Sequence, residues 1–176
     1  NKLTVDLGCG ETLINYALSS IPGEKLHRVV VVTQYPQVAA LAEKYSFTPL
    51  HNPYPERGQS ESIRIGLAAL ADCDAVMFQV ADQPRLKKET VADLIGFAAA
   101  HPDRIVGLGH SGRRGNPCIF PARFFPELMA LEGDVGGNVV IRAHPDALLL
   151  YETSAAELRD VDTVEALAAV QEDRQI

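Results

Sequence analysis

The chain has 176 residues, of which 47% are hydrophobic and 22% are charged, and its formal net charge is −7. This composition is typical of a folded globular domain and excludes a disordered chain. The acidic balance argues against a nucleic-acid-binding surface, which would concentrate Lys and Arg. No apolar run is long enough to span a membrane, and no signal peptide opens the chain, so we expect no membrane partner.

The three cysteines, Cys9, Cys73 and Cys118, are odd in number, widely scattered and without a CxxC pair. This pattern argues against disulfides and against a structural zinc site, so we expect a cytoplasmic protein. Neither an internal repeat nor a linker interrupts the sequence. We therefore expect residues 1–176 to form one domain.

Helix-like and strand-like patterns alternate along most of the chain. Apolar residues at helical spacing predict helices, and continuous apolar or β-branched runs predict buried strands. In chain order, the predicted elements are a helix over residues 13–18, a strand over 29–33, helices over 38–45 and 63–70, a strand over 76–80, a helix over 91–98, strands over 105–108 and 118–120, a helix over 124–131, a strand over 147–151 and a helix over 163–170. The alternation predicts an α/β fold with three αβα layers around a mainly parallel sheet.

Asp82 follows directly after the strand predicted over residues 76–80. Ligands of open α/β sheets bind beyond the carboxyl ends of the strands, which makes this a favoured place for a functional carboxylate. Asp82 can hold Mg2+ against substrate phosphates. Asp is also a favoured N-cap, and Asp82 is equally compatible with capping a helix that begins near Arg85.

Residues 51–62 form a polar loop with two prolines. Gly58 permits a positive φ, and either of the next two residues can cap the following helix. The N–H groups at the start of that helix suit an anionic or polar ligand, and Asn52, Ser60 and Ser62 can then bind a base or a ribose. An ordinary capped loop explains the same residues, and without the carboxylate after the strand it is the favoured interpretation.

Residues 107–117 are rich in glycine and contain Arg113 and Arg114. The glycines let the backbone approach a ligand closely, and the arginines can grip a phosphate or a carboxylate. A solvent-exposed hairpin tip has the same composition, with the two arginines as a solvated pair.

Two acidic segments follow, over residues 133–138 and 160–163. Asp134 can supply a second carboxylate for a cation or an acceptor group, or it can cap a helix over residues 139–143. Asp162 is favoured as a cap of the last helix rather than as a metal ligand. The sequence contains no P-loop, no dinucleotide-binding glycine motif and no nucleophile elbow.

The order of these motifs resembles the molybdenum cofactor nucleotidyltransferase family, especially its cytidylyltransferase branch, over essentially the whole chain. The matching motifs are Asn52-Pro53, Gly58-Gln59-Ser60-Glu61-Ser62, Asp82-Gln83-Pro84, Gly115-Asn116-Pro117, Gly133-Asp134-Val135-Gly136 and Asp160-Val161-Asp162-Thr163. The resemblance implies a Rossmann-like nucleotidyltransferase fold. It also implies an enzyme that uses Mg2+ to transfer CMP or GMP from CTP or GTP to the terminal phosphate of molybdopterin, releasing pyrophosphate.

By matched position, the resemblance implies a role for each of these residues. Asp82 would be the metal ligand, and Lys2, the last residue of the family's glycine-rich signature, would contact phosphate; together they are the expected catalytic residues. The implied nucleotide site comprises Asn52, Gly58, Ser60, Ser62 and Asp82. The implied acceptor site comprises Gly115, Asn116, Pro117 and Asp134, with Asp134 as a second metal ligand.

The rest of that signature, which resembles LxxGxSxRMGxxK, is not in the sequence, and we expect residues before Asn1 to supply it. Two other interpretations remain open. The same carboxylate geometry would serve a nucleotidyltransferase whose acceptor is a phospho-sugar or phospholactate. A chain without the signature would instead suit a non-catalytic chaperone that carries the cofactor to a molybdenum hydroxylase apoenzyme.

Overall fold

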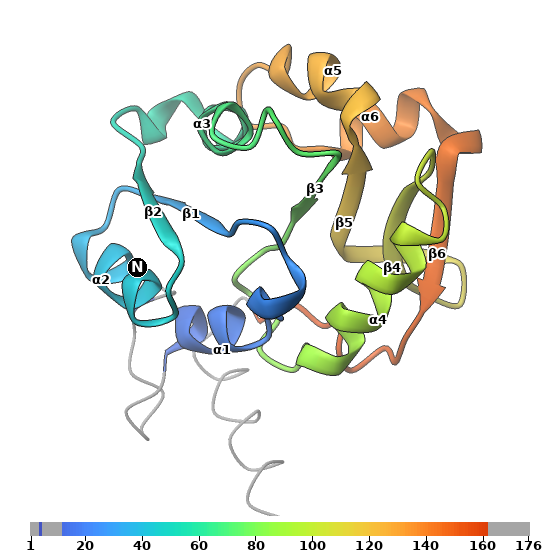
Figure 1. Cartoon of the computed structure of the whole chain (residues 1–176), viewed down its shortest axis with the longest axis horizontal. Coiled ribbons are helices and arrows are strands. Elements are labelled where there is room, and N and C mark those ends of the chain that lie inside the picture. Colours follow the sequence, from blue (N-terminus) through green and yellow to red (C-terminus); the bar gives the residue numbers. More distant parts are fainter. Residues whose placement is uncertain (1–3, 5–11, 162–176) are drawn as a thin grey trace, which may run out of the picture.

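A computed structural model of the chain describes residue 4 and residues 12–161 and has an α/β architecture (Figure 1). The α-helices are α1 (Leu13–Ser19), α2 (Pro36–Lys44), α3 (Gln59–Ala68), α4 (Lys88–Ala99), α5 (Phe125–Met129) and α6 (Asn138–Ala143). The strands are β1 (Val30–Thr33), β2 (Thr48–His51), β3 (Ala75–Phe78), β4 (Ile105–His110), β5 (Arg113–Pro121) and β6 (Leu148–Glu152). Short 3₁₀ turns are η2 (Gly23–Lys25), η3 (Pro55–Arg57), η4 (Ala122–Phe124) and η5 (Pro145–Ala147).

The strands form two sheets. β1 and β2 pair in parallel, and a four-stranded sheet has the order β3-β5-β4-β6. In this larger sheet β6 runs parallel to β4, while β5 runs antiparallel to both β3 and β4. Strands β3, β4 and β6 therefore share one direction and β5 alone opposes it. This arrangement confirms the predicted α/β fold with a mainly parallel sheet.

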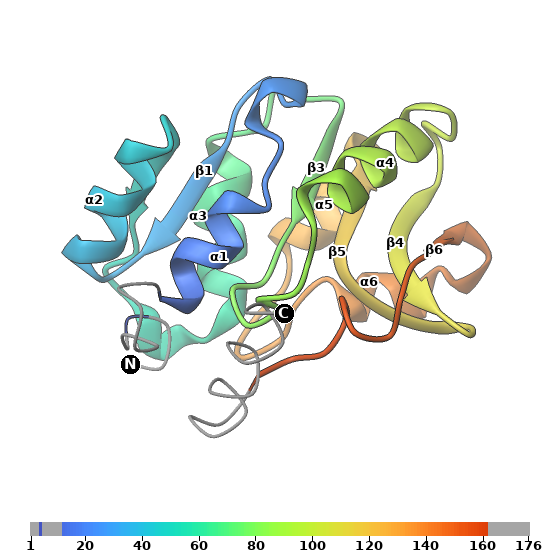
Figure 2. The same cartoon turned by 90° about the horizontal axis from the view of Figure 1, so that it is seen from below.

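Helices cover both faces of the four-stranded sheet, which gives the three predicted layers (Figures 1 and 2). On one face, Val91 and Leu94 of α4 pack against Val106, Leu108 and Ile119. The other face carries the larger core, to which α3, α5 and α6 contribute Ile63, Leu67, Phe125, Leu128, Val140 and Ile141. Successive strand residues point to opposite faces, so neighbours on β4 and β5 belong to different cores.

A third core lies beside the two-stranded sheet. It consists of buried residues of α1 and α2 together with the residue that directly precedes β2, namely Ile14, Leu18, Val38, Ala42 and Phe47. Val31 of β1 packs against this core, whereas Val30 packs against the core beneath α3. One face of β1 therefore contacts the core beside the two-stranded sheet, and the opposite face contacts the core beneath α3.

Several boundaries differ from the sequence prediction. Strand β2 was not predicted, because it is short and contains Pro49, which cannot donate a ladder hydrogen bond and is tolerated on a strand with one neighbour. Strand β5 begins at Arg113 rather than at residue 118, and a two-residue turn at Ser111 and Gly112, with φ of 50° and 77°, joins it to β4. Such a turn matches the twist of a tight hairpin, so the hairpin interpretation of this segment is confirmed at its tip.

The helix predicted over residues 163–170 lies outside the described residues, as do Lys2, Cys9 and Asp162. Among the described helices, none is both long and apolar enough to cross a membrane.

Candidate functional site

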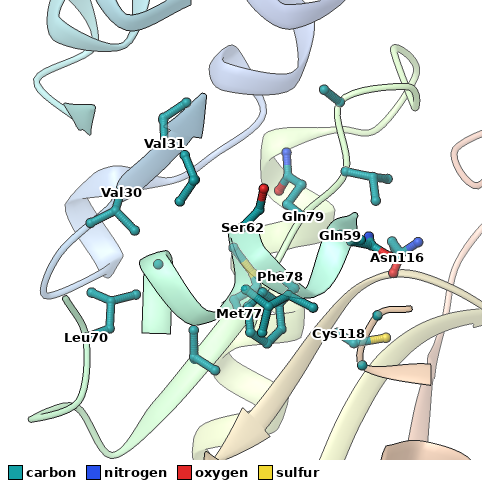
Figure 3. Close-up of a pocket in the computed structure, with 18 of the residues that line it drawn as sticks. Val30, Val31, Gln59, Ser62, Leu70, Met77, Phe78, Gln79, Asn116 and Cys118 are labelled. Atoms are coloured by element: carbon teal, nitrogen blue, oxygen red, sulfur yellow. The ribbon is translucent and has the colours of Figure 1, made fainter. Parts of the chain in front are cut away.

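A cavity of about 1280 Å³ lies between β1 and β3, the two strands that end their respective sheets (Figure 3). Along much of its length the lining is apolar and comes from β1, α3 and β3, including Val30, Val31, Leu70, Met77 and Phe78. Its polar lining comes largely from the residues after β2, the start of α3, the start of β5 and the segment before α6. These residues are Asn52, Gln59, Ser62, Arg114, Asn116, Asp134 and Asn138.

The polar region lies beyond the carboxyl end of β3. The β3–β5 ladder ends with Phe78 opposite Cys118, while β5 extends five residues further toward its own start. The first residues of β5, Arg114 and Asn116 among them, therefore project past β3 toward the segment that carries Asp82. A site at this end fits the rule that ligands of open α/β sheets bind beyond the carboxyl ends of strands.

The start of α3 is closed by a segment distant in the sequence. The Gln59 N–H donates to Asp134 Oδ1 at 3.1 Å, and the Ser60 N–H donates to the Gly133 carbonyl at 3.2 Å. The Glu61 N–H donates to the Gly58 carbonyl at 3.3 Å. The prediction of free N–H groups for a ligand is therefore wrong for these first three positions, because residues 133–134 accept the first two N–H groups and the Gly58 carbonyl accepts the third.

Asp134 thus acts as a cap, but for α3 rather than for the helix over 139–143 considered from the sequence. The side chains of Gln59 and Ser60 do not cap α3; its N-cap is Gly58, with φ of 82°. A Cβ at Gly58 would lie 2.6 Å from the Asp134 Cα, so only glycine permits this close approach. The exposed Asp134 side chain lines the cavity beside this contact.

Asn52 and Ser62 meet at the cavity wall. The Asn52 Nδ2 donates to Ser62 Oγ at 3.1 Å, and Asn52 Oδ1 accepts the Tyr54 N–H at 2.9 Å. Asn52 directly follows β2 and is buried, with 4% of its surface exposed. The pair therefore places a fixed amide and a hydroxyl where a polar ligand group can bind.

Arg114 is held in place by three acceptors. Its Nη2 donates to Asn138 Oδ1 at 2.9 Å, and its Nη1 approaches Cys118 Sγ at 3.3 Å and the Gly115 carbonyl at 3.4 Å. Burial raises the pKa of the Cys118 thiol, while the adjacent guanidinium acts in the opposite direction. Arg113, the preceding residue, is exposed, so only one of the two arginines is a solvated side chain.

Asp82 lies four residues beyond the end of β3 and does not cap α4, which begins at Lys88 with Lys87 as its N-cap. The backbone around it is anchored, because the Val161 N–H donates to the Asp82 carbonyl at 2.8 Å. The buried Gln83 side chain donates to the Leu158 carbonyl and to Asp160 Oδ1, at 3.2 and 3.0 Å. The Asp-Gln-Pro motif therefore joins the end of β3 to residues 158–161.

The predicted site residues divide into two groups. Asn52, Gly58, Ser62, Asn116 and Asp134 line the cavity, whereas Ser60, Asp82, Gly115 and Pro117 do not. Ser60 and Pro117 are fully buried, and Gly115 packs so closely on Leu158 that a Cβ would lie 2.8 Å from its Cδ2. These three are packing positions in this structure, and Asp82 lies next to Ala81, which does line the cavity.

Sequence reasoning missed Gln59, Gln79 and Asn138 as lining residues. Gln79 was treated only as part of a strand, yet its Nε2 donates to the Ala17 carbonyl and to Ser20 Oγ, both at 2.9 Å. Its buried Oε1 has no hydrogen-bond partner within the described residues. A glutamine within an otherwise apolar run was the available signal, because a buried amide needs partners.

The described residues contain no cluster of three or more His, Cys, Asp or Glu side chains that could hold a metal ion. Asp82 and Asp134 are the two carboxylates that the sequence analysis assigns to a metal ion, and of the two only Asp134 lines the cavity.

Comparison with known proteins adds the family. The family model described as the MobA-like NTP transferase domain matches residues 1–148. The chain belongs to this family. Among the curated proteins, no sequence gave a significant match.

Solved structures of nucleotidyltransferases share the fold. A nucleotidyl transferase from Methanothermobacter thermautotroptrophicus is 18% identical, with a TM-score of 0.79 over 99% of this chain and 86% of that one. The Rv0371C protein of Mycobacterium tuberculosis H37Rv, solved in complex with manganese, is 18% identical, with a TM-score of 0.73 over 97% and 90%. The molybdopterin-guanine dinucleotide biosynthesis protein A of Archaeoglobus fulgidus is 15% identical, with a TM-score of 0.70 over 99% and 90%.

At these identities the structural likeness establishes the fold, and the family match makes the chain a nucleotidyltransferase. The nucleoside triphosphate is thus the class of substrate that the family handles. The acceptor and the metal belong to the proposal that follows.

Proposed function

We propose that the protein transfers CMP or GMP from CTP or GTP to the terminal phosphate of a molybdopterin-type cofactor and releases pyrophosphate. The observation that carries the proposal is the set of polar side chains gathered at the carboxyl end of β3, in a chain of the MobA-like family. A structural neighbour named for molybdopterin-guanine dinucleotide biosynthesis supports the choice of acceptor.

In this proposal the acceptor phosphate attacks the α-phosphate of the triphosphate, and pyrophosphate leaves. The reaction joins two anions, so its main requirement is positive charge that offsets their repulsion. Mg2+ supplies that charge when bound, with Asp82 as its proposed ligand and Asp134 as the second carboxylate. A neighbour solved with manganese supports a divalent ion.

The chain's own residues have positioning roles. The Asn52–Ser62 pair would bind the base or ribose, and Asn116 of β5 would face the acceptor. Lys2, outside the described residues, remains the proposed phosphate contact. No nucleophile or general base is required, because the acceptor phosphate is itself the nucleophile.

The test is a pyrophosphate-release assay with the full-length protein. Purified protein is incubated with CTP or GTP, Mg2+ and molybdopterin, and pyrophosphate is measured with a coupled enzyme. We expect release that needs all three components and stops when EDTA removes the metal. Parallel reactions replace molybdopterin with a phospho-sugar or phospholactate.

Two results would contradict the proposal. Release with a phospho-sugar or phospholactate but not with molybdopterin would assign a different acceptor. Binding of molybdopterin without release from either triphosphate would favour a cofactor-carrying protein that serves a molybdenum hydroxylase apoenzyme.

A further inference from the structure

Arg114 is a cation whose charge is not balanced by a neighbouring carboxylate. It is half-buried and lines the cavity, and within the described part of the chain it takes part in no ion pair. Its hydrogen-bond partners are neutral acceptors, namely an amide oxygen, a thiol and a carbonyl. Arginine at a partly desolvated position normally finds an anion, so the missing partner points to a ligand.

The guanidinium has donors left over for such a ligand. Of its five N–H bonds, those of Nη1 are directed at Gly115 and Cys118 and one of Nη2 is directed at Asn138. The Nε–H and the second Nη2 N–H have no partner among the residues described. Two donors on one edge of a guanidinium match two oxygens of a phosphate or carboxylate.

Asn138 fixes the direction in which those donors point. It is the first residue of α6 and follows Gly136 and Gly137, which pack against Gln59 and Phe120 so closely that a Cβ would lie 2.5 and 2.7 Å from their side chains. The start of α6 is thereby held against the core. Its amide oxygen, 2.9 Å from Arg114 Nη2, then holds one edge of the guanidinium.

We infer that Arg114, positioned by Asn138, is the anion-binding subsite that holds the phosphomonoester group of the acceptor. The identity of the anion rests on the proposed function, whereas the location of the subsite rests on the geometry of Arg114. In the Asn52–Ser62 pair, proposed for the nucleoside, Asn52 follows β2 and Ser62 belongs to α3, whereas Arg114 and Asn138 belong to β5 and α6. The nucleoside and the acceptor phosphate would then contact different helices and strands.

The test is a binding titration that needs no turnover. Phenyl phosphate serves as the phosphomonoester probe, and the Nε–H resonance of Arg114 is followed by NMR in the full-length protein. We expect that resonance to shift with phenyl phosphate in the unmodified protein. Arg114→Ala should weaken binding roughly tenfold or more, because a charge-assisted contact is lost. Arg114→Lys should restore part of it, since a point charge lacks the paired donors.

Two further variants separate positioning from general charge. Asn138→Ala should weaken the binding of phenyl phosphate several-fold, although the Arg114 side chain is still present. The matched control is Arg113→Ala, which removes the same charge from the exposed neighbouring position and should leave binding unchanged. CTP affinity, measured on the same samples, should change little in all four variants.

The outcomes are distinct from those of the turnover assay. An unchanged Nε–H resonance, or equal losses for Arg113→Ala and Arg114→Ala, would overturn the subsite. A fall in CTP affinity without a fall in phenyl phosphate affinity would assign Arg114 to the triphosphate instead and would also overturn it. If phenyl phosphate binds as expected and no acceptor supports pyrophosphate release, the proposed function fails and the anion subsite stands.

Discussion

Arg113 and Arg114 show how neighbouring residues on one strand acquire different roles. Side chains alternate along β5, so one arginine faces solvent and the other faces the cavity. The sequence marks both as anion-binding candidates and cannot separate them, because which is buried depends on the strand's start and register. That start lies five residues before the predicted one, at Arg113.

Cys118 gives a prediction at the scale of one residue. Only 2% of its surface is exposed, and burial raises the pKa of its thiol, so the reactive thiolate is scarce. We expect iodoacetamide to modify Cys118 much more slowly than the half-buried Cys73 in the native chain, as measured by mass spectrometry of tryptic peptides. Equal rates at the two positions would contradict the buried environment of Cys118.

The same pKa shift sets the sign of a pH effect. Since the folded-state pKa of Cys118 lies above the ordinary value of 9.0, the unfolded chain releases this proton first. The contribution of Cys118 to the free energy of unfolding is therefore complete below pH 9.0 and is lost as the pH rises beyond it.

At the scale of elements, the contact between α3 and the loop over residues 133–136 organises the polar end of the cavity. The two segments lie 75 residues apart where the Gln59 N–H meets Asp134. The sequence indicates a special backbone at Gly58 and an acidic, glycine-rich loop at residues 133–138. The sequence does not reveal that the start of α3 and this loop are in contact, because no local pattern encodes a contact between segments so far apart in the chain.

Gly58→Ala tests this contact. Both Gly58 and Gly112 have positive φ, but a Cβ at Gly58 would collide with the Asp134 backbone, whereas a Cβ at Gly112 has nothing within 4 Å. Each substitution should cost about 1 kcal/mol of conformational strain. Gly58→Ala should lose at least about 2 kcal/mol more in urea unfolding, because backbone must move. Equal losses in the two variants would show that the loop does not close on α3.

Other elements are predictable from the sequence only where their own residue pattern, rather than packing against distant segments, determines their structure. The long apolar runs predict β1, β3 and β4 well, since their composition is decided by burial on both faces. The short strand β2 escapes prediction because it is brief and stabilised by packing rather than by its own pattern. Helix α6, in contrast, begins one residue before the helix considered over residues 139–143. Asn52, which lines the polar region, directly follows the strand that was missed.

At the scale of the whole molecule, the polar residues meet because strands from separate parts of the chain end on one side. In Figure 2, β1 and β3 run in the same direction, and the segments after them gather at one end of the molecule. The order of strands predicted the α/β fold, and the cavity has its polar lining at the strand ends where the sequence analysis expects a site. The sequence alone could not assign Ser60, Gly115 and Pro117 to packing, because exposure follows from the completed fold.

Asp82 links this architecture to the proposed chemistry. It lies four residues beyond the end of β3, its carbonyl accepts a hydrogen bond from the Val161 N–H, and the neighbouring Gln83 fixes residues 158–161. Helix α4 begins at Lys88 with Lys87 as its N-cap, so Asp82 does not cap it. In the proposed reaction the charge of Asp82 is the feature on which metal-dependent transfer should depend.

The most direct measurement is the rate of pyrophosphate release by Asp82→Asn as Mg2+ is titrated. This change keeps the size of the side chain and removes its charge, and Asp93→Asn on the exposed side of α4 is the matched control. We predict a loss of about 100-fold or more for Asp82→Asn at every Mg2+ concentration, with an unchanged melting temperature and full activity in the control. An Asp82→Asn protein that releases pyrophosphate at the unmodified rate would contradict the metal-binding role of this residue.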